Sequence, residues 1–188
     1  PETRIQNLSD QDDAVSEPIV LNNSFTYFGE TITKILISSN GNIQFDEDNK
    51  STEYSNSSSG HWLRKQISFL WDDLNPSSSG TIKYGYMDDG LNSNAIFVLA
   101  FIQVHEYGTA NENSIQIKLF LNNADTANRG KIEIKYGALN LQTTDSVTIG
   151  ISNGIEANTI PFNNYNVSSI SINNFIGVGF DYLQAYVL

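Results

Sequence analysis

The sequence predicts an all-β fold: an antiparallel β-sandwich or jelly-roll-like domain of about ten to twelve strands. Two observations carry this prediction. Apolar and polar residues alternate with a period of two along most of the chain, and turn dipeptides separate the alternating runs. A helix is expected at most as one short turn near residues 61–66, because no 3.6-residue pattern extends further.

The expected strands follow one another at intervals of roughly 8–15 residues. In KIEIKYG, Ile132, Ile134 and Tyr136 alternate with charged residues, which predicts a strand with one buried face. The run 95–104 is almost continuously apolar and predicts a central strand covered on both faces. The other strands are expected at residues 34–38, 42–45, 67–71, 81–87, 114–121 and 146–152.

Turn signals separate these runs. Asn40-Gly41 lies between two expected strands and predicts a hairpin, since this dipeptide tolerates positive φ. Polar segments at residues 46–60 and 75–80 predict loops. Further turns are expected at Asp89-Gly90, Arg129-Gly130 and Asn153-Gly154.

The length of 188 residues fits one all-β domain with a sizeable core. Residues 1–18 are acidic and are expected to form a lead or linker, with a single domain over residues 19–188. Additional strands are expected within residues 156–188. The chain stops inside an apolar pattern, so we expect a piece of a longer protein whose signal peptide and anchor lie outside it.

Composition excludes several classes of partner. A net charge of −11 disfavours nucleic acid and anionic lipid, which basic surfaces bind. No apolar run approaches the roughly 18 residues that span a bilayer, so no direct membrane insertion is expected. The absence of cysteine excludes disulfides and thiolate sites. Cations, neutral sugars and basic protein surfaces remain as partners.

An extracellular location is expected from the neutral polar surface, which is rich in Asn, Ser and Thr. Such a composition also produces chance matches to the glycosylation pattern Asn-x-Ser/Thr, so glycosylation is left open. The matches are Asn7, Asn22, Asn49, Asn56 and Asn166.

Acidic clusters raise the question of a metal site. They occur near Asp12, at 46–48, at Asp72-Asp73 and at 88–89. Calcium prefers six to eight oxygen ligands, and we take Asp72 and Asp73 as candidate ligands and calcium as the candidate cofactor. None of the clusters has the EF-hand spacing, so solvated turn residues are the alternative explanation.

The stretch ISFLWDDLN places these two carboxylates directly after a hydrophobic run. Strict alternation puts Ile67, Phe69 and Trp71 on one face and predicts Trp71 as a core anchor. Asp73 then points toward the edge of the core, where we expect it to cap the loop that follows.

Catalysis is not predicted. His105-Glu106 begins an H-E-x-x-H motif, but position 109 is Thr. No G-x-S-x-G elbow is present, and adjacent carboxylates on an extended chain face opposite sides. Loop aromatics could instead stack on sugar rings, with core packing as the alternative. The candidate ligand-binding residues are Tyr54, Trp62, Tyr107 and Tyr165.

Seven phrases follow one another in the chain: SNGNIQF (39–45), FLWDDLN (69–75), GTIKYGY (80–86), IFVLAFIQVHEY (96–107), SIQIKLF (114–120), KIEIKYG (131–137) and VTIGISNG (147–154). In this order they resemble the nidogen-like domain of bacterial and protist surface proteins, over roughly residues 20–155. The chain departs from that family in two places: residues 100–104 lack its usual tryptophan, and Leu70 separates Phe69 from Trp71.

The resemblance implies an extracellular β-sandwich module of adhesive, matrix or cell-surface proteins, and it implies no catalytic residues. The leading hypothesis is a non-catalytic module that acts in adhesion or assembly through protein contacts, at its edge strands and at loops 46–60 and 105–114. The alternatives are a carbohydrate-binding module, with or without calcium, and a self-assembling subunit of a surface filament.

Overall fold

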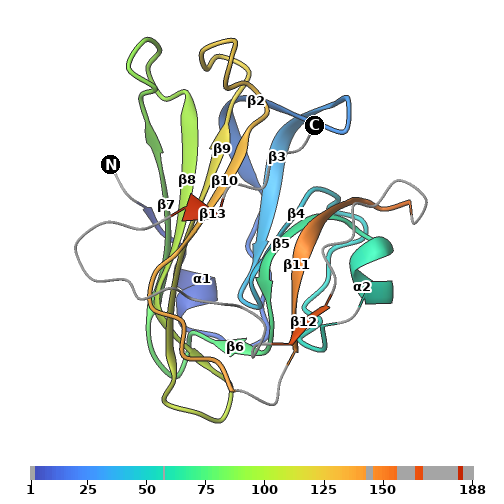
Figure 1. Ribbon diagram of the computed structural model, residues 1–188, viewed down its shortest axis with the longest axis vertical. Coiled ribbons are helices and arrows are strands. Elements are labelled where there is room, and N and C mark those ends of the chain that lie inside the picture. The colour runs from blue at the N-terminus through green and yellow to red at the C-terminus, as the bar shows by residue number, and fades with distance from the viewer. Residues whose placement is uncertain (1–2, 57, 143–145, 156–163, 167–181, 184–188) are drawn as a thin grey trace.

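The computed structural model describes residues 3–56, 58–142, 146–155, 164–166 and 182–183, which form two antiparallel sheets packed face to face (Figure 1). The first sheet contains, in spatial order, β1 (Thr3–Arg4), β7 (Thr81–Met87), β8 (Ile96–Glu106), β9 (Glu112–Phe120), β10 (Ile132–Tyr136) and β13 (Tyr182–Leu183), with β6 (Leu74–Asn75) paired to β8. The second contains β12 (Asn164–Asn166), β11 (Ser146–Asn153), β5 (Lys65–Trp71), β4 (Asn42–Gln44), β3 (Glu30–Ser38) and β2 (Ile19–Tyr27).

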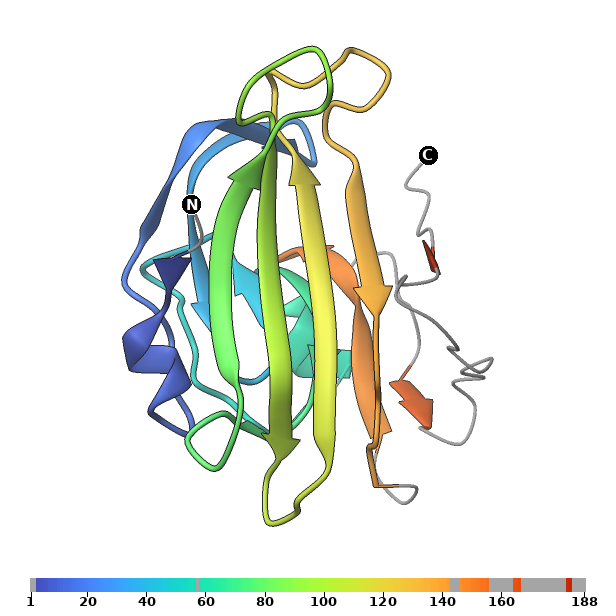
Figure 2. The same ribbon diagram turned by 90° about the vertical axis from the view of Figure 1, so that its left-hand side faces the viewer.

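The β-sandwich prediction is confirmed, and its connectivity is that of two meanders. Strands β7 to β10 pair consecutively in one sheet and β2 to β5 in the other, instead of forming the two Greek keys of a jelly roll (Figures 1 and 2). The described residues form 13 strands, one more than the predicted maximum. The excess comes from two-residue strands such as β1 and β6, which are too short for an alternating pattern.

The described residues contain two short helices, where a single helical turn was predicted. The turn expected near residues 61–66 is α2 (Ser58–Trp62), which ends before β5 begins at Lys65. A further helix, α1 (Gln6–Ser9), lies in the N-terminal segment, where no helix was expected. Neither helix is long and apolar enough to cross a membrane.

The N-terminal segment packs against the sandwich. Strand β1 pairs with β7, and Ile5, Leu8 and Ala14 belong to the core cluster. Ser16 exchanges two hydrogen bonds with the backbone of Ile37 in β3: its N–H donates to the carbonyl (2.8 Å), and its Oγ accepts from the N–H (3.0 Å). The residues predicted to form a lead are therefore held against β7 at their start and along β3 at their end.

Alternation along β9 and β10 directs one face of each strand into the core. Ile117, Leu119 and Ile134 are buried there, and each such side chain contributes about 1.5–3 kcal/mol by leaving water. Strand β8 is central, as predicted, but it is not covered on both faces. Ile102 is 38% exposed on its outer side, because nothing described packs over that face (Figure 2).

A β-bulge at the end of β5 overturns the predicted face of Trp71. The N–H groups of Phe69 and Leu70 both donate to the carbonyl of Gly41, at 3.1 Å each, so two residues oppose one. Leu70 consequently joins Ile67 and Phe69 in the core cluster. Trp71 is also buried, but it lies outside that cluster, and its indole Nε1 donates to the carbonyl of Glu53 (2.9 Å).

Candidate functional site

Asn40, in the tight turn between β3 and β4, joins three segments at one end of the sandwich. Its buried Nδ2 donates to Asp13 Oδ1 (2.7 Å) in the N-terminal segment and to the carbonyl of Thr52 (3.3 Å) in the loop after β4. Its Oδ1 accepts from the N–H of Leu74 (3.0 Å), and its carbonyl accepts from the N–H of Asp72 (3.3 Å). The side chain thus fixes the end of β5 relative to both loops.

Three carboxylates meet beside this turn. Asp12, Asp13 and Asp73 each place one oxygen within 4.8 Å of the others. The Oδ1 atom of Asp12 is buried and has no hydrogen-bond partner in the described part of the chain. Burial, together with the neighbouring Asp13 carboxylate, raises the pKa of Asp12 above its ordinary value. Carboxylates so close together repel one another, and a cation between them would relieve that repulsion.

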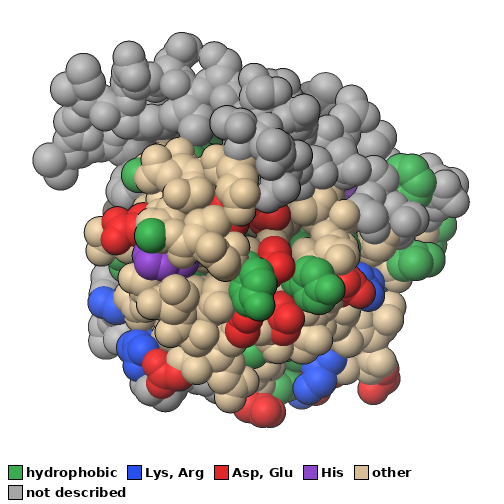
Figure 3. Space-filling view, turned by 90° about the horizontal axis from the view of Figure 1, so that it is seen from below, with side chains coloured by type: hydrophobic (Ala, Val, Ile, Leu, Met, Phe, Trp, Pro, Cys, Tyr) green, Lys and Arg blue, Asp and Glu red, His purple; other side chains and the backbone are tan. Residues whose placement is uncertain are grey.

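Two of the four aromatic candidates flank these carboxylates. The N–H of Tyr107 donates to the carbonyl of Asp73 (2.8 Å), and Tyr54 follows the loop backbone that Asn40 holds. Their side chains are 54% and 48% exposed, respectively. Figure 3 shows this end of the molecule, where acidic side chains gather between hydrophobic ones. We call the surface formed by Asp12, Asp13, Asp73, Tyr54 and Tyr107 the acidic end.

The other two aromatic candidates are placed differently. Trp62 lies on α2 at the second sheet, where its carbonyl accepts a hydrogen bond from Ser152 Oγ of β11 (3.4 Å), and it is partly buried. The side chain of Tyr165, in β12, falls outside the part of the chain that the structure describes. The structure therefore brings two of the candidates to one surface and leaves Trp62 away from it.

The two adjacent aspartates have separate environments. Asp72 is 4% exposed, and its Oδ1 accepts from the N–H of Asp73 (3.0 Å) and from Asn56 Nδ2 (3.5 Å). Asp73 instead contributes its carboxylate to the acidic end. In the loop that follows, the N–H of Ser78 is bound by Asn75 Oδ1 (3.1 Å), and a cap supplied by Asp73 stays a prediction.

In the remaining acidic clusters, aspartates accept hydrogen bonds from the backbone of loops. Asp46 Oδ1 accepts from the N–H of Asp48 (3.1 Å). Asp89 accepts three backbone N–H groups, from Leu91, Asn92 and Asp125, and these hydrogen bonds lower its pKa to about 2. Such carboxylates close loops, which is the ordinary role of Asp in turns.

The two histidines differ in burial. His61 belongs to α2 and is buried against β5, with its Nδ1 2.9 Å from Ser68 Oγ, and burial lowers its pKa to about 4. A substrate cannot reach that pair without displacing the helix. His105 is elsewhere, with its Nδ1 3.0 Å from Ser78 Oγ.

Three of the five glycosylation matches can be placed. The side chains of Asn22, on β2, and Asn49, in the loop after β4, are exposed. Asn56 is partly buried because it donates to Asp72. The side chains of Asn7 and Asn166 lie outside the described part, and glycosylation at all five stays a prediction.

Comparison with known proteins gives one family. A family model described as NIDO related matches residues 1–177. The match extends beyond the region of the sequence resemblance at both ends. No curated protein and no solved structure matches the chain.

Proposed function

Because the chain belongs to the NIDO-related family, we propose that it is a non-catalytic extracellular module of a larger cell-surface or matrix protein. In this proposal the module acts in adhesion or assembly, and the acidic end is its contact surface. The observation that carries it is the cluster of three carboxylates at the turn where Asn40 binds Asp13 and the loop before Tyr54, with the backbone of Tyr107 bound to that of Asp73. Exposed aromatics with a charged rim are typical of protein contact sites.

The chemistry of the acidic end selects a basic protein partner. Three carboxylates within 4.8 Å of one another concentrate negative charge, and partner guanidinium groups would neutralise it with charge-assisted hydrogen bonds. Asp13 is exposed and is the carboxylate that a partner reaches first, whereas the Asp12 oxygen without a hydrogen-bond partner is buried. Tyr54 and Tyr107 add apolar area and stack with guanidinium planes.

A peptide titration tests this proposal. Hexa-arginine and hexa-glutamate peptides are titrated by calorimetry into the wild-type protein and into the variant Asp12→Asn/Asp13→Asn. Hexa-arginine should bind the wild type, the variant should bind it at least about tenfold more weakly, and hexa-glutamate should not bind. Tyr107→Ala should also weaken binding, whereas Leu91→Ala, at a more exposed side chain on the loop at the opposite end, should not. Equal binding by wild type and carboxylate variant would contradict the proposal.

A second candidate function is calcium-dependent glycan binding at the same surface. The buried, unpartnered Asp12 oxygen and its raised pKa favour it, because a divalent cation would satisfy both. Calcium would need further oxygens from backbone or water, and the tyrosines would stack on a sugar ring. Asp73, which the sequence analysis selected as a ligand, would belong to this site, with Asp12 and Asp13 in place of Asp72.

Thermal unfolding with calcium and with chelator separates the two candidates. Under the calcium hypothesis, ligand at 100 times its Kd adds about 2.7 kcal/mol, which raises the wild-type Tm by roughly 5–10 °C. Asp12→Asn should abolish that increment while leaving the chelated protein at least as stable as the wild type, since the substitution removes a carboxylate whose charge burial disfavours. A calcium-independent Tm and a glycan array without binding in calcium would reject this second candidate.

A further inference from the structure

The outer face of the second sheet carries polar side chains that are buried. Ile43 and Ile67 belong to the core cluster, so the residues beside them in β4 and β5 point to the opposite face. On that face, paired residues of β3, β4, β5 and β11 are at most 2% exposed, and the polar ones are Ser38, Asn42, Gln44, Gln66, Ser68 and Ser152. A face made mostly of hydroxyl and amide groups is also stable in water, so it tolerates the loss of its cover.

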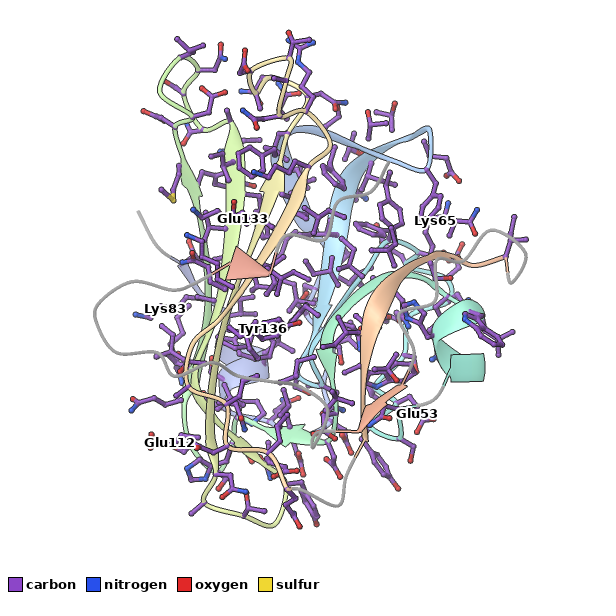
Figure 4. The ribbon with its side chains drawn as sticks, in the orientation of Figure 1. Glu53, Lys65, Lys83, Glu112, Glu133 and Tyr136 are labelled. Atoms are coloured by element: carbon purple, nitrogen blue, oxygen red, sulfur yellow. The ribbon has the colours of Figure 1, made fainter. Side chains whose placement is uncertain are left out.

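The cover is the connection between β4 and β5, which folds back over its own hairpin (Figure 1). Helix α2 covers one part, with His61 Nδ1 2.9 Å from Ser68 Oγ and 3.2 Å from Gln66 Nε2. Residues 46–56, which we call the covering loop, lie over another part, and Figure 4 shows Glu53 on the side of the second sheet that faces away from the first. Connections of this length are uncommon in a compact domain and are usually functional.

Three side chains from the β3–β4 hairpin and β5 bind the main chain of three consecutive residues of the covering loop. The side chains of Thr52 and Glu53 are exposed, so these contacts recognise the loop through its backbone, which all peptides share. The contacts are Gln44 Nε2 to the carbonyl of Ser51 (2.7 Å), the N–H of Ser51 to Gln44 Oε1 (2.8 Å), Asn40 Nδ2 to the carbonyl of Thr52 (3.3 Å) and Trp71 Nε1 to the carbonyl of Glu53 (2.9 Å).

The covering loop is attached by polar contacts. Between residues 46 and 55 every side chain is exposed except that of Ser51, which is half-buried. Besides hydrogen bonds, the loop has an exposed ion pair between Lys34 and Glu47 (3.2 Å). Water or another peptide can replace such contacts at little net cost. Segments that bury few apolar groups open locally while the rest of the domain stays folded, so we expect the covering loop to open by itself.

We propose that the face beneath the covering loop is a binding site for the main chain of an extended peptide segment of a partner protein, and that the loop occupies this site until such a segment displaces it. The partner would take over the hydrogen bonds of Gln44 and Trp71. Its apparent affinity is reduced by the fraction of molecules in which the loop is closed, so the loop regulates the site. The inference goes beyond the proposed function, because it uses none of the carboxylates of the acidic end.

A peptide titration followed by NMR tests the proposal. Ser51→Pro removes the N–H that Gln44 accepts and leaves the side chains of the site unchanged, whereas Ser51→Ala keeps that N–H. A peptide with the sequence of residues 48–56 and blocked termini is added to each isotope-labelled protein. In Ser51→Pro, the signals of the Trp71 indole N–H and the Gln44 side-chain amide should shift with a Kd of about 1 mM or below. Binding should be at least about tenfold weaker in the wild type and in Ser51→Ala, whose own loops compete, and weaker again in Ser51→Pro/Gln44→Leu.

Two altered peptides distinguish recognition of the main chain from recognition of side chains. A peptide methylated on the backbone nitrogen of Ser51 should bind Ser51→Pro at least about tenfold more weakly, because it has no N–H for Gln44. A peptide carrying Thr52→Ala/Glu53→Ala should bind within about twofold of the original, since those side chains are exposed. The opposite ranking, or no binding to Ser51→Pro at about 5 mM peptide, overturns the proposal.

Hydrogen exchange of the wild type provides a test that needs no variant. The N–H of Ser51 should exchange at least about a hundredfold faster than the amides of β4 and β5, although it is hydrogen-bonded to Gln44, because the covering loop opens without them. If the Ser51 amide is protected as strongly as those of β5, the loop opens only when the whole domain unfolds. A partner segment could then not displace it, and the proposal is wrong.

Discussion

Gly41 supports the acidic end, and replacing it with alanine should reduce stability more than its backbone conformation alone explains. Gly41 has φ of 78°, in the left-handed region, where a side chain costs roughly 1–2 kcal/mol. A Cβ at this position would lie 1.9 Å from the carbonyl oxygen of Leu70, which is backbone and cannot rotate away. Relieving such an overlap in a packed region costs about 1–3 kcal/mol more.

Gly29 provides a matched control. Its φ is 80°, and a Cβ there would meet nothing within 4 Å. Urea denaturation should therefore show a loss of about 1–2 kcal/mol for Gly29→Ala and of about 2–5 kcal/mol for Gly41→Ala. Gly41→Ala should also weaken binding at the acidic end, because the displaced end of β5 carries Asp73. If the two variants lose the same free energy of unfolding, the close approach of the Leu70 carbonyl to Gly41 does not constrain the turn, and the reasoning is refuted.

Three further predictions concern buried polar groups. Burial lowers the pKa of His61 from 6.5 to about 4, so as the pH falls through this window the unfolded chain binds a proton that the folded chain does not. Stability in urea should drop by roughly 3 kcal/mol between pH 7 and pH 4, and His61→Gln should flatten that drop. Tyr27→Phe removes a hydroxyl that donates to Gln66 O (2.8 Å) and accepts from Ser152 N–H (3.0 Å), and should lower stability by about 1–3 kcal/mol in thermal unfolding. Trp71→Phe removes the bond to Glu53 and should speed hydrogen exchange in residues 46–56 with little effect on β9.

Period-two alternation was sufficient to predict strands whose two faces differ in environment. Residues 131–137 are the clearest case, because Ile134 faces the core while Glu133 and Lys135 form ion pairs on the opposite side. The turn at Asn40-Gly41 was predictable for a similar reason, since positive φ at Gly41 is a local requirement. Local rules therefore identified the framework of the sandwich.

The composition of the acidic end could not be predicted by such rules. Asp12 and Asp73 are 61 positions apart in the chain, and their proximity depends on how the N-terminal segment packs along β3. That segment has only isolated apolar residues, such as Ile5 and Leu8, and a two-residue strand. Its sequence therefore shows no alternating pattern, and its acidic composition predicts a linker instead of a packed segment. The cluster near Asp12 and the pair Asp72-Asp73 were each visible in the sequence. Their convergence follows from tertiary structure alone.

The bulge at Phe69 and Leu70 explains why two adjacent aspartates have different roles. Without it, strict alternation would place Trp71 in the core together with Phe69. The extra residue opposite Gly41 moves Leu70 into the core and turns Trp71 toward Glu53, so every following side chain is shifted by one position. Asp72 is then buried, and its carboxylate accepts hydrogen bonds from the N–H of Asp73 and from Asn56 Nδ2. Asp73 instead lies beside Asp12 and Asp13 in the acidic end. A carboxylate that stabilises the fold and a carboxylate of the acidic end can therefore follow each other in sequence, because the irregularity in the strand, and not the spacing of the two residues, separates their environments.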